Sequence, residues 1–269
     1  MTALSSLSPR PPRAHHSVLE LSRVFFEASS GYLLKPLMRA LPKGDGHSVM
    51  TLPGFFGADG STASLRRFLD RQRYNAIPWG LGRNIPSEGL ATMEATLEFR
   101  HRTEQALAQS IAAEVGRTRR KVSLVGWSLG GLYATSLAHR HPDLIRQVVT
   151  LGTPFGDPRG TSVYSVMQRM NNAEVAPELL EQWSEHTFAG NLEVPVTAVY
   201  SQSDGIVGES IAKLPEHPLM ESIAVIASHI GFPFNPLVRA LLCERLGQNE
   251  GRWQPWQQQF LKPLIHQPG

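Results

Sequence analysis

The sequence has 269 residues, of which 41% are hydrophobic and 18% are charged, and its net charge is +3. This is an ordinary globular composition, which excludes wholesale disorder, coiled coil and collagen-like repeats. The single cysteine, Cys243, excludes an intramolecular disulfide and cysteine-based zinc sites, and no apolar run reaches the roughly 18 residues of a membrane-spanning helix.

The basic excess lies at the start of the chain. Lys and Arg outnumber Asp and Glu in residues 1–47 but balance them in the rest, so the body is not expected to bind nucleic acid. Residues 1–16 are rich in Ser, Pro, Arg and His, which predicts a disordered leader. They lack the apolar core of a secretory signal, which together with the single cysteine predicts a cytoplasmic protein.

Residues 17–46 are predicted to form an N-terminal helical segment. Apolar side chains that include Leu21 and Phe25 fall on one face of a first helix with Ser17 as its N-cap, and a second short helix follows. One interpretation packs these helices on the main domain. The other is peripheral membrane contact through residues 17–41, which the aromatic side chains beside the basic excess favour.

From residue 47 the chain alternates short apolar runs with helical stretches. The predicted strands are 48–53, 74–79, 121–127, 146–152, 195–201 and 221–227. The predicted helices are 62–71 with Ser61 as N-cap, 89–115 with Gly116 as C-cap, 129–140 and 236–247. Such alternation favours an α/β fold with a mostly parallel sheet and helices on both of its faces. We expect one domain over residues 47–248, followed by a C-terminal tail over 249–269.

The stretch between the fourth and fifth predicted strands is too long for a simple crossover. Residues 156–194 carry two helical patterns and apolar side chains, among them Tyr164 and Met167, that need burial. This insertion is predicted to form a small helical cap over a site at the carboxyl ends of the strands. The alternative is a longer surface excursion.

The sequence GWSLGG over residues 126–131 contains the pattern G-x-S-x-G. The pattern is weak by itself, but here a predicted strand precedes it and a predicted helix follows it. In that context Ser128 lies on a tight turn with its Oγ exposed, and the N-terminus of the helix points at developing negative charge.

A serine hydroxyl needs a base to become nucleophilic, and the base needs an acid to orient it. His229 follows the last predicted strand by two residues, so it is a better candidate for the base than His217 or His266. Asp204 lies just beyond the preceding strand and is the candidate acid; its rival is Glu209, further into the loop.

An oxyanion hole needs two N–H donors. Leu129, which follows the serine, is expected to supply one of them. The loop TLPGFFG over residues 51–57 is expected to supply the other through Phe55, with Phe56 in reserve, because Gly54 lets the backbone turn its amides inward. The alternative is an ordinary glycine turn.

These motifs resemble those of serine α/β-hydrolases of the lipase and esterase type. GWSLGG resembles their nucleophile elbow, and LGTPF over residues 151–155 resembles the segment after the next strand. SQSDGIV over 201–207 and SHIGFPFNP over 228–236 resemble the acid and histidine loops. The first loop has Pro53 where histidine is usual, and resembles a bacterial branch with a Pro-Gly-Phe oxyanion loop.

The resemblance implies cleavage of a carboxylic ester through an acyl-enzyme on Ser128, with Asp204 and His229 completing the triad and with no metal or organic cofactor. The expected substrate is a small-molecule acyl ester or lipid, with a medium-chain acyl group or a thioester included. An acyltransferase with the same triad is the alternative. A non-catalytic binding protein of this fold is less favoured, because all three residue types occur in order at strand ends.

Overall fold

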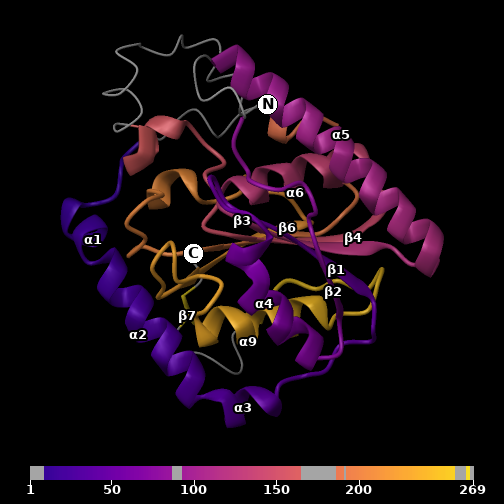
Figure 1. Ribbon diagram of the computed structural model, residues 1–269, viewed down its shortest axis with the longest axis horizontal. Helices are drawn as coiled ribbons and strands as arrows, with labels where there is room; N and C mark the ends of the chain where they lie inside the picture. The colour runs from indigo at the N-terminus through magenta and orange to yellow at the C-terminus, as the bar shows by residue number, and fades with distance from the viewer. Residues whose placement is uncertain (1–8, 87–92, 165–185, 191, 258–264, 267–269) are drawn as a thin grey trace.

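The computed structural model describes residues 9–86, 93–164, 186–190, 192–257 and 265–266. Six parallel strands form the body of one sheet: β1 (Ser48–Leu52), β2 (Asn75–Pro78), β3 (Val122–Trp127), β4 (Ile145–Leu151), β5 (Val196–Tyr200) and β6 (Met220–Val225). A short β7 (Ile265–His266) pairs antiparallel with β6. The order across the sheet is β2-β1-β3-β4-β5-β6-β7 (Figure 1). All six predicted strands and the predicted α/β fold are confirmed.

Helices cover both faces of this sheet (Figure 1). The α-helices are α1 (Ala14–Val18), α2 (Glu20–Leu33), α3 (Lys35–Arg39), α4 (Asp59–Arg71), α5 (Met93–Thr118), α6 (Leu129–Arg140) and α9 (Pro236–Leu246). Two short 3-10 helices are η1 (Pro158–Gly160) and η2 (Glu209–Ile211). One face packs against α4 and α9, and the other packs against α5 and α6. The core is therefore divided by the sheet into two apolar layers.

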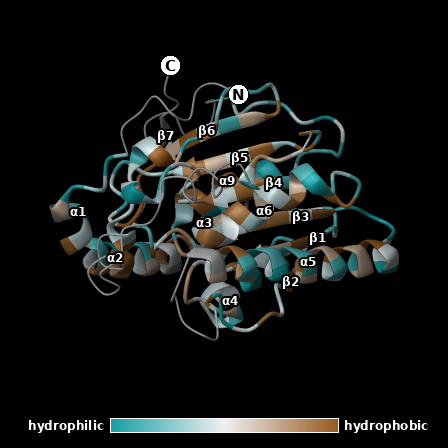
Figure 2. Ribbon diagram, turned by 90° about the horizontal axis from the view of Figure 1, so that it is seen from above, coloured by the Kyte–Doolittle hydropathy of each residue, from teal (hydrophilic) through white to brown (hydrophobic). Residues whose placement is uncertain are grey.

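The strands form because their side chains alternate between these two layers. Val49 and Val125 point into the layer under α4 and α9, whereas Met50 and Leu124 point into the layer under α5 and α6. A strand that is buried on both faces reads as a continuous apolar run, and the central strands are coloured mostly as hydrophobic in Figure 2. This is why the sequence reveals the strands so clearly.

Two predicted helix ends are wrong. The N-cap of α4 is Ala58, and Ser61 lies inside the first turn with its hydroxyl donating to the Ala58 carbonyl at 2.7 Å. Gly116 lies within α5 and does not cap it; the helix ends before Arg119, whose φ of 58° is in the left-handed region. In both cases the helix extends past the residue that favoured an end.

The N-terminal segment is held against the domain by hydrogen bonds that composition does not reveal. Part of the leader predicted to be disordered, residues 1–16, lies outside the described residues, but α1 forms and the Arg10 N–H donates to the Ser210 hydroxyl at 3.2 Å. Ser17 is not an N-cap, since it lies in α1 and its hydroxyl donates to the Gly205 carbonyl at 2.6 Å.

Described residues after position 248 also belong to the domain. Trp256 is buried in the core, and its N–H donates to the Glu221 carboxylate at 2.7 Å. Because β7 also extends the sheet, the domain continues beyond the predicted boundary at residue 248. Most of the predicted cap, residues 165–185, lies outside the described residues. None of the described helices is both long enough and apolar enough to span a membrane.

Candidate active site

The sheet topology brings two loops together at one edge. The chain runs from β1 outward to β2 and then returns to β3 on the other side of β1. Open α/β sheets bind ligands at the carboxyl ends of strands where the strand order reverses in this way. Leu52 pairs with Gly126 across β1 and β3, and Trp127 pairs with Leu151 across β3 and β4. The loops that follow these strands therefore begin side by side.

Ser128 occupies a strained turn between β3 and α6. Its φ of 52° and ψ of −121° lie in a backbone region that residues other than glycine rarely adopt. The Ser128 N–H donates to the Leu151 carbonyl at 2.8 Å, and the Thr153 hydroxyl donates to the Ser128 carbonyl at 3.0 Å. These bonds from the neighbouring strand end hold the backbone in this conformation. The half-buried Ser128 side chain stands at the N-terminus of α6, as predicted.

The glycines on either side of Ser128 allow close backbone approach. A Cβ at Gly126 would lie 2.4 Å from the Gly131 Cα, and a Cβ at Gly130 would lie 2.5 Å from the Leu52 carbonyl oxygen. Both distances are far below van der Waals contact, so a side chain at either position would force α6 away from the sheet. The pattern G-x-S-x-G is therefore a packing requirement of this turn.

The structure brings Asp204 and His229 together. His229 Nδ1 lies 2.7 Å from Asp204 Oδ2, and both side chains are buried. The other carboxylate oxygen of Asp204 accepts the N–H groups of Ile206 at 2.7 Å and Val207 at 2.8 Å. Because a carboxylate accepts, this contact assigns the proton to Nδ1 and leaves Nε2 as the basic nitrogen.

His229 is also linked to the residue that precedes the serine. The indole N–H of Trp127 donates to the His229 carbonyl at 3.0 Å, and the two ring centroids are 6.2 Å apart. Between Ser128 Oγ and His229 the described residues show no hydrogen bond. Catalytic hydrogen bonds often shorten only when substrate binds.

The rival residues have other partners. Glu209 lies in η2, where its carboxylate pairs with Lys213 at 2.9 Å. His217 is exposed, and its Nδ1 accepts the Leu219 N–H at 3.1 Å. His266 lies in β7, and its side chain is outside the described part of the chain. Asp204 is thus the acid that contacts His229.

Two N–H groups are available near Ser128. Leu129 is the first residue of α6, where an N–H has no partner within the helix. The loop after β1 lies against the serine, since a Cβ at Gly54 would be 3.1 Å from the Ser128 Cβ. In the described ranges the Phe55 N–H makes no hydrogen bond, so it is available to an oxyanion as Leu129 is.

Asn84 holds the loop after β1, and its contacts indicate which of the Phe55 and Phe56 N–H groups is available as an oxyanion donor. The Phe56 N–H donates to the Asn84 carbonyl at 3.0 Å, so it is not a free donor. The fully buried Asn84 amide donates to the Pro53 carbonyl at 2.8 Å and accepts from the Tyr133 hydroxyl at 3.0 Å. The sequence alone assigned no role to Asn84, because these partners come from distant segments.

The sequence reasoning missed two buried carboxylates on α2. Glu20 and Glu27 are only 5% and 7% exposed, and both bond to the loops that carry Asp204 and His229. The helix therefore packs with its polar face inward, whereas an amphipathic helix normally buries its apolar face. Their spacing of seven residues, which places both on one helical face, was the available signal.

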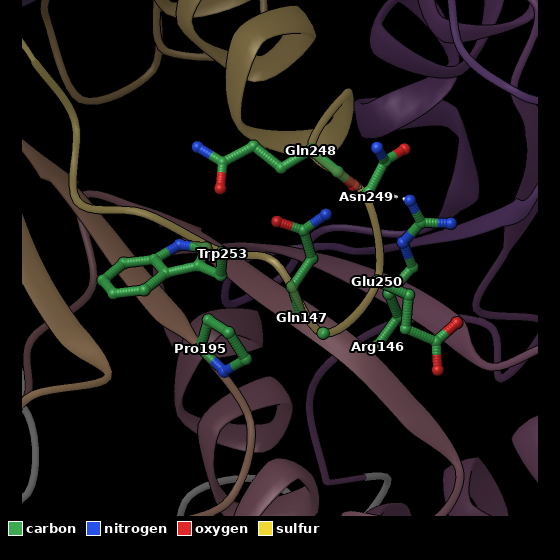
Figure 3. A pocket seen from close by; sticks show the side chains of 8 residues that line it. Arg146, Gln147, Pro195, Gln248, Asn249, Glu250 and Trp253 are labelled. Atoms are coloured by element: carbon green, nitrogen blue, oxygen red, sulfur yellow. Dashed lines mark hydrogen bonds between the residues drawn. The ribbon is translucent and has the colours of Figure 1, made fainter.

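A small cavity lies at the opposite edge of the sheet (Figure 3). It is lined in part by Arg146 and Gln147 at the start of β4, by Pro195 before β5, and by Trp253. Its volume of about 20 Å³ suits one water molecule. Arg146 Nε and Trp253 Nε1 lack a hydrogen-bond partner among the described residues, which fits a bridging water. The cavity is remote from Ser128.

Known proteins share this architecture. A family model described as "alpha/beta hydrolase fold" matches residues 118–173. The Bacillus licheniformis lipase BlEst2 superposes with a TM-score of 0.55 at 15% identity, covering 78% of this chain and 95% of that one. A structure from a report on the metagenome-derived lipolytic enzymes LipS and LipT has a TM-score of 0.54 at 14% identity, covering 76% and 93%. A search of curated protein sequences finds no significant match.

A third solved structure, Aspergillus fumigatus lipase B, has a TM-score of 0.55 at 18% identity and covers 78% of this chain and 55% of that one. The structural superpositions establish the fold, but at sequence identities this low they do not transfer an activity. The chain has the α/β-hydrolase fold.

Proposed function

From the α/β-hydrolase fold of this chain we propose a serine hydrolase that cleaves carboxylic esters through an acyl-enzyme on Ser128. The observation that carries the proposal is the 2.7 Å bond between buried His229 and Asp204, beside a strained serine at the switch point of the sheet. A histidine oriented by a carboxylate is what a serine needs to lose its proton at neutral pH. The lipase and esterase structures with the same fold agree with ester substrates.

In this mechanism Ser128 Oγ attacks the ester carbonyl carbon while His229 Nε2 takes its proton. The tetrahedral oxyanion accepts hydrogen bonds from the N–H groups of Leu129 and Phe55. His229 then gives the proton to the leaving alcohol as the carbon–oxygen bond breaks, which leaves an acyl-enzyme. Water, deprotonated by His229, then attacks the acyl carbonyl carbon; as the bond from that carbon to Ser128 Oγ breaks, His229 returns the proton to Oγ, and the carboxylic acid and the free serine are released. Asp204 orients the imidazole and stabilises its charged form throughout.

We propose an apolar acyl group as the substrate part that this site recognises, as in a lipid or medium-chain acyl ester. Phe55 and Phe56 follow the glycine that touches Ser128, and their ring centroids are 4.3 Å apart. Phe56 is 57% exposed. An aromatic pair beside the nucleophile offers apolar surface to an acyl chain.

The test is labelling with a fluorophosphonate probe together with turnover of p-nitrophenyl esters of increasing chain length. We expect the protein to be labelled and Ser128→Ala to be unlabelled, with turnover lowered by about 10³–10⁶-fold. Ser110→Ala, at an exposed serine of α5, is the matched control and keeps both activities. Near-normal turnover by Ser128→Ala or His229→Ala would contradict the mechanism. Transfer of the acyl group to an added alcohol in preference to water would identify an acyltransferase.

We also propose that residues 17–41 contact a lipid surface. Leu21, Phe25, Phe26 and Leu33 of α2 are between 72% and 76% exposed, so none of the described residues covers the apolar face of the helix. Residues 17–41 carry three basic side chains against two acidic ones, Glu20 and Glu27, and because both acidic ones are buried, the segment does not present them to anionic lipid headgroups.

Sedimentation with vesicles of phosphatidylcholine and phosphatidylglycerol tests this contact. We expect the double variant Phe25→Ser/Phe26→Ser to bind vesicles at least about tenfold more weakly, since each aromatic side chain contributes more than 1 kcal/mol of transfer free energy. Arg102→Ser, at an exposed position of α5, is the control. Equal binding by the double variant and the unaltered protein would refute the proposal.

A further inference from the structure

The polar face of α2 contacts the residues on both sides of Asp204 and of His229. Glu20 contacts Gly205 and Ile230, which directly follow the two residues. Arg23 and Glu27 contact the two residues that directly precede them. One helix from the start of the chain therefore reaches two loops that lie about 180 to 210 positions later in the sequence.

Glu20 connects the two loops through a single carboxylate. Its Oε2 accepts the Gly205 N–H at 3.1 Å, and its Oε1 accepts the Ile230 N–H at 2.8 Å. The carboxylate is buried, so these bonds are shielded from competing water. A carboxylate that accepts from both loops fixes the distance between them, and hence between Asp204 and His229.

Glu27 holds the histidine loop at the residue directly before His229. Its Oε1 accepts the Ser228 N–H at 2.7 Å, and its Oε2 accepts the Ser228 hydroxyl at 2.9 Å. The loop is shaped to receive this carboxylate, because a Cβ at Gly231 would lie only 1.4 Å from Glu27 Oε2. Glycine at position 231 is therefore required by the contact with α2.

Arg23 completes the contact from the same face of the helix. Its Nη1 donates to the Ser203 carbonyl at 2.5 Å, on the residue before Asp204. Arg23, Glu20 and Glu27 are spaced by three and four residues, which places them on one stripe of the helix. The stripe supplies one donor and two acceptor groups to loops that offer one carbonyl, three N–H groups and one hydroxyl.

We propose that α2 is a positioning element for the proposed active site, in which Glu20 and Glu27 hold the acid and histidine loops at the spacing that proton transfer needs. The inference rests on the proposed function, because it concerns the geometry of Asp204 and His229. Both glutamates are positioning residues that act through the backbone of these loops. The helix would thus influence the active-site geometry although it carries none of the three proposed triad residues.

The two glutamates differ in how their hydrogen bonds respond to replacement by glutamine. Both partners of Glu20 are backbone N–H groups, which only donate, so the amide nitrogen of a glutamine would face a donor. One partner of Glu27 is a hydroxyl, which accepts as well as donates, so a glutamine at position 27 keeps two hydrogen bonds. Glu20→Gln therefore breaks one of its bonds, whereas Glu27→Gln rearranges its bonds.

The electrostatics agree with this placement. Burial raises the pKa of Glu20, its backbone bond from Ile230 lowers it, and the nearby Asp204 raises it while His229 lowers it. Three backbone N–H donors and one hydroxyl offset only part of the cost of burying the two carboxylates, because burial raises the pKa of both.

The test compares Glu20→Gln and Glu27→Gln in the full chain by steady-state turnover of a p-nitrophenyl ester. A shift of the loops by a fraction of an ångström to 1 Å costs up to about 100-fold in rate. We expect Glu20→Gln to lower kcat by about 10–100-fold with KM within about twofold, and Glu27→Gln to lower kcat less than about fivefold. The low-field proton signal of the His229 Nδ1–H bond should shift or broaden in Glu20→Gln.

Glu221→Gln is the matched control for loss of a buried carboxylate. Glu221 lies at the amino end of β6, where it accepts from Trp256 and Arg245 and contacts neither loop. It should lower the melting temperature while leaving kcat and the low-field signal unchanged. An unchanged kcat in Glu20→Gln, with the unaltered protein labelled by a fluorophosphonate, would overturn the positioning role alone. A protein that neither labels nor hydrolyses esters would instead overturn the proposed function.

Discussion

Two amphipathic helices of this protein, α4 and α2, face the domain in opposite ways. Leu65, Phe68 and Leu69 of α4 are buried in the core, and its Arg67 and Asp70 are exposed. In α2 the order is reversed, since the charged stripe lies inward and the apolar side chains, such as Leu21 and Phe25, lie outward.

The difference shows that an amphipathic pattern specifies a helix with two faces and leaves open which face meets the domain. An apolar face seeks any apolar layer, because the hydrophobic effect is not directional. A polar face is buried only where specific donors and acceptors await it, as the N–H groups of the acid and histidine loops do for α2. Burial of a polar face is thus a sign of a position-specific contact.

The largest expected effect contrasts the same substitution on the two helices. Leu65→Ala, in the core under α4, should lower the free energy of unfolding by about 2–5 kcal/mol because it leaves a cavity. Leu21→Ala, on the outward face of α2, should change it by about 0.5 kcal/mol or less. Urea unfolding followed by circular dichroism measures both. Equal losses would mean that the outward face of α2 is covered in solution, for example by a second copy of the chain.

The loss of kcat in Glu20→Gln is the intermediate effect, and it tests the buried polar face of α2. This substitution removes a polar contact of α2, and its effect is measured as a change in kcat. Leu65→Ala removes an apolar contact of α4, and its effect is measured as a change in the free energy of unfolding.

The smallest expected effect is a pH dependence of stability. Burial, the largest influence, raises the pKa of Glu27 above 4.5, so the folded state binds this proton more tightly than the unfolded state does. The stabilisation from this carboxyl is therefore complete below pH 4.5 and lost as pH rises through the raised pKa. We expect the stability of Glu27→Gln relative to the unaltered protein to increase from pH 4.5 to pH 7 in urea titrations.

For Glu114→Gln we expect a pH dependence of relative stability with the opposite sign. Hydrogen bonds from Arg117, the largest influence, lower the pKa of Glu114, so this carboxyl stabilises the fold above pH 4.5 and loses that contribution as pH falls through its lowered pKa. Its variant should therefore lose stability relative to the unaltered protein as pH rises from below the lowered pKa to about 4.5, and should show little further change from pH 4.5 to pH 7. The same slope in both variants would contradict the assigned causes.

Much of the proposed active site was predictable because its residues follow strands. A parallel sheet delivers the carboxyl ends of its strands to one edge, so the turn at Ser128 and the loops that carry Asp204 and His229 lie at the same edge although they are far apart in the sequence. Apolar runs locate the strands, and the position of each residue just after a run then locates the site. The preference for Asp204 over Glu209 and for His229 over His217 follows from the same rule.

Other features depended on partners that the sequence does not identify. Phe56 differs from Phe55 as a donor only because Asn84, held by Tyr133, takes its N–H. The sequence predicts that Trp256 belongs to a C-terminal tail, but the residue packs in the core and its backbone N–H donates to Glu221. Each outcome rests on a contact between segments that are distant along the chain.

By itself the sequence determined the strands, the turn at Ser128 and the order of the acid and the histidine, because apolar periodicity and glycine spacing are local properties. The tertiary structure decided which face of α2 is buried and how Glu20 joins the two loops. The physical reason is that a buried carboxylate is stabilised by particular N–H groups, and only the folded chain brings Gly205 and Ile230 to it.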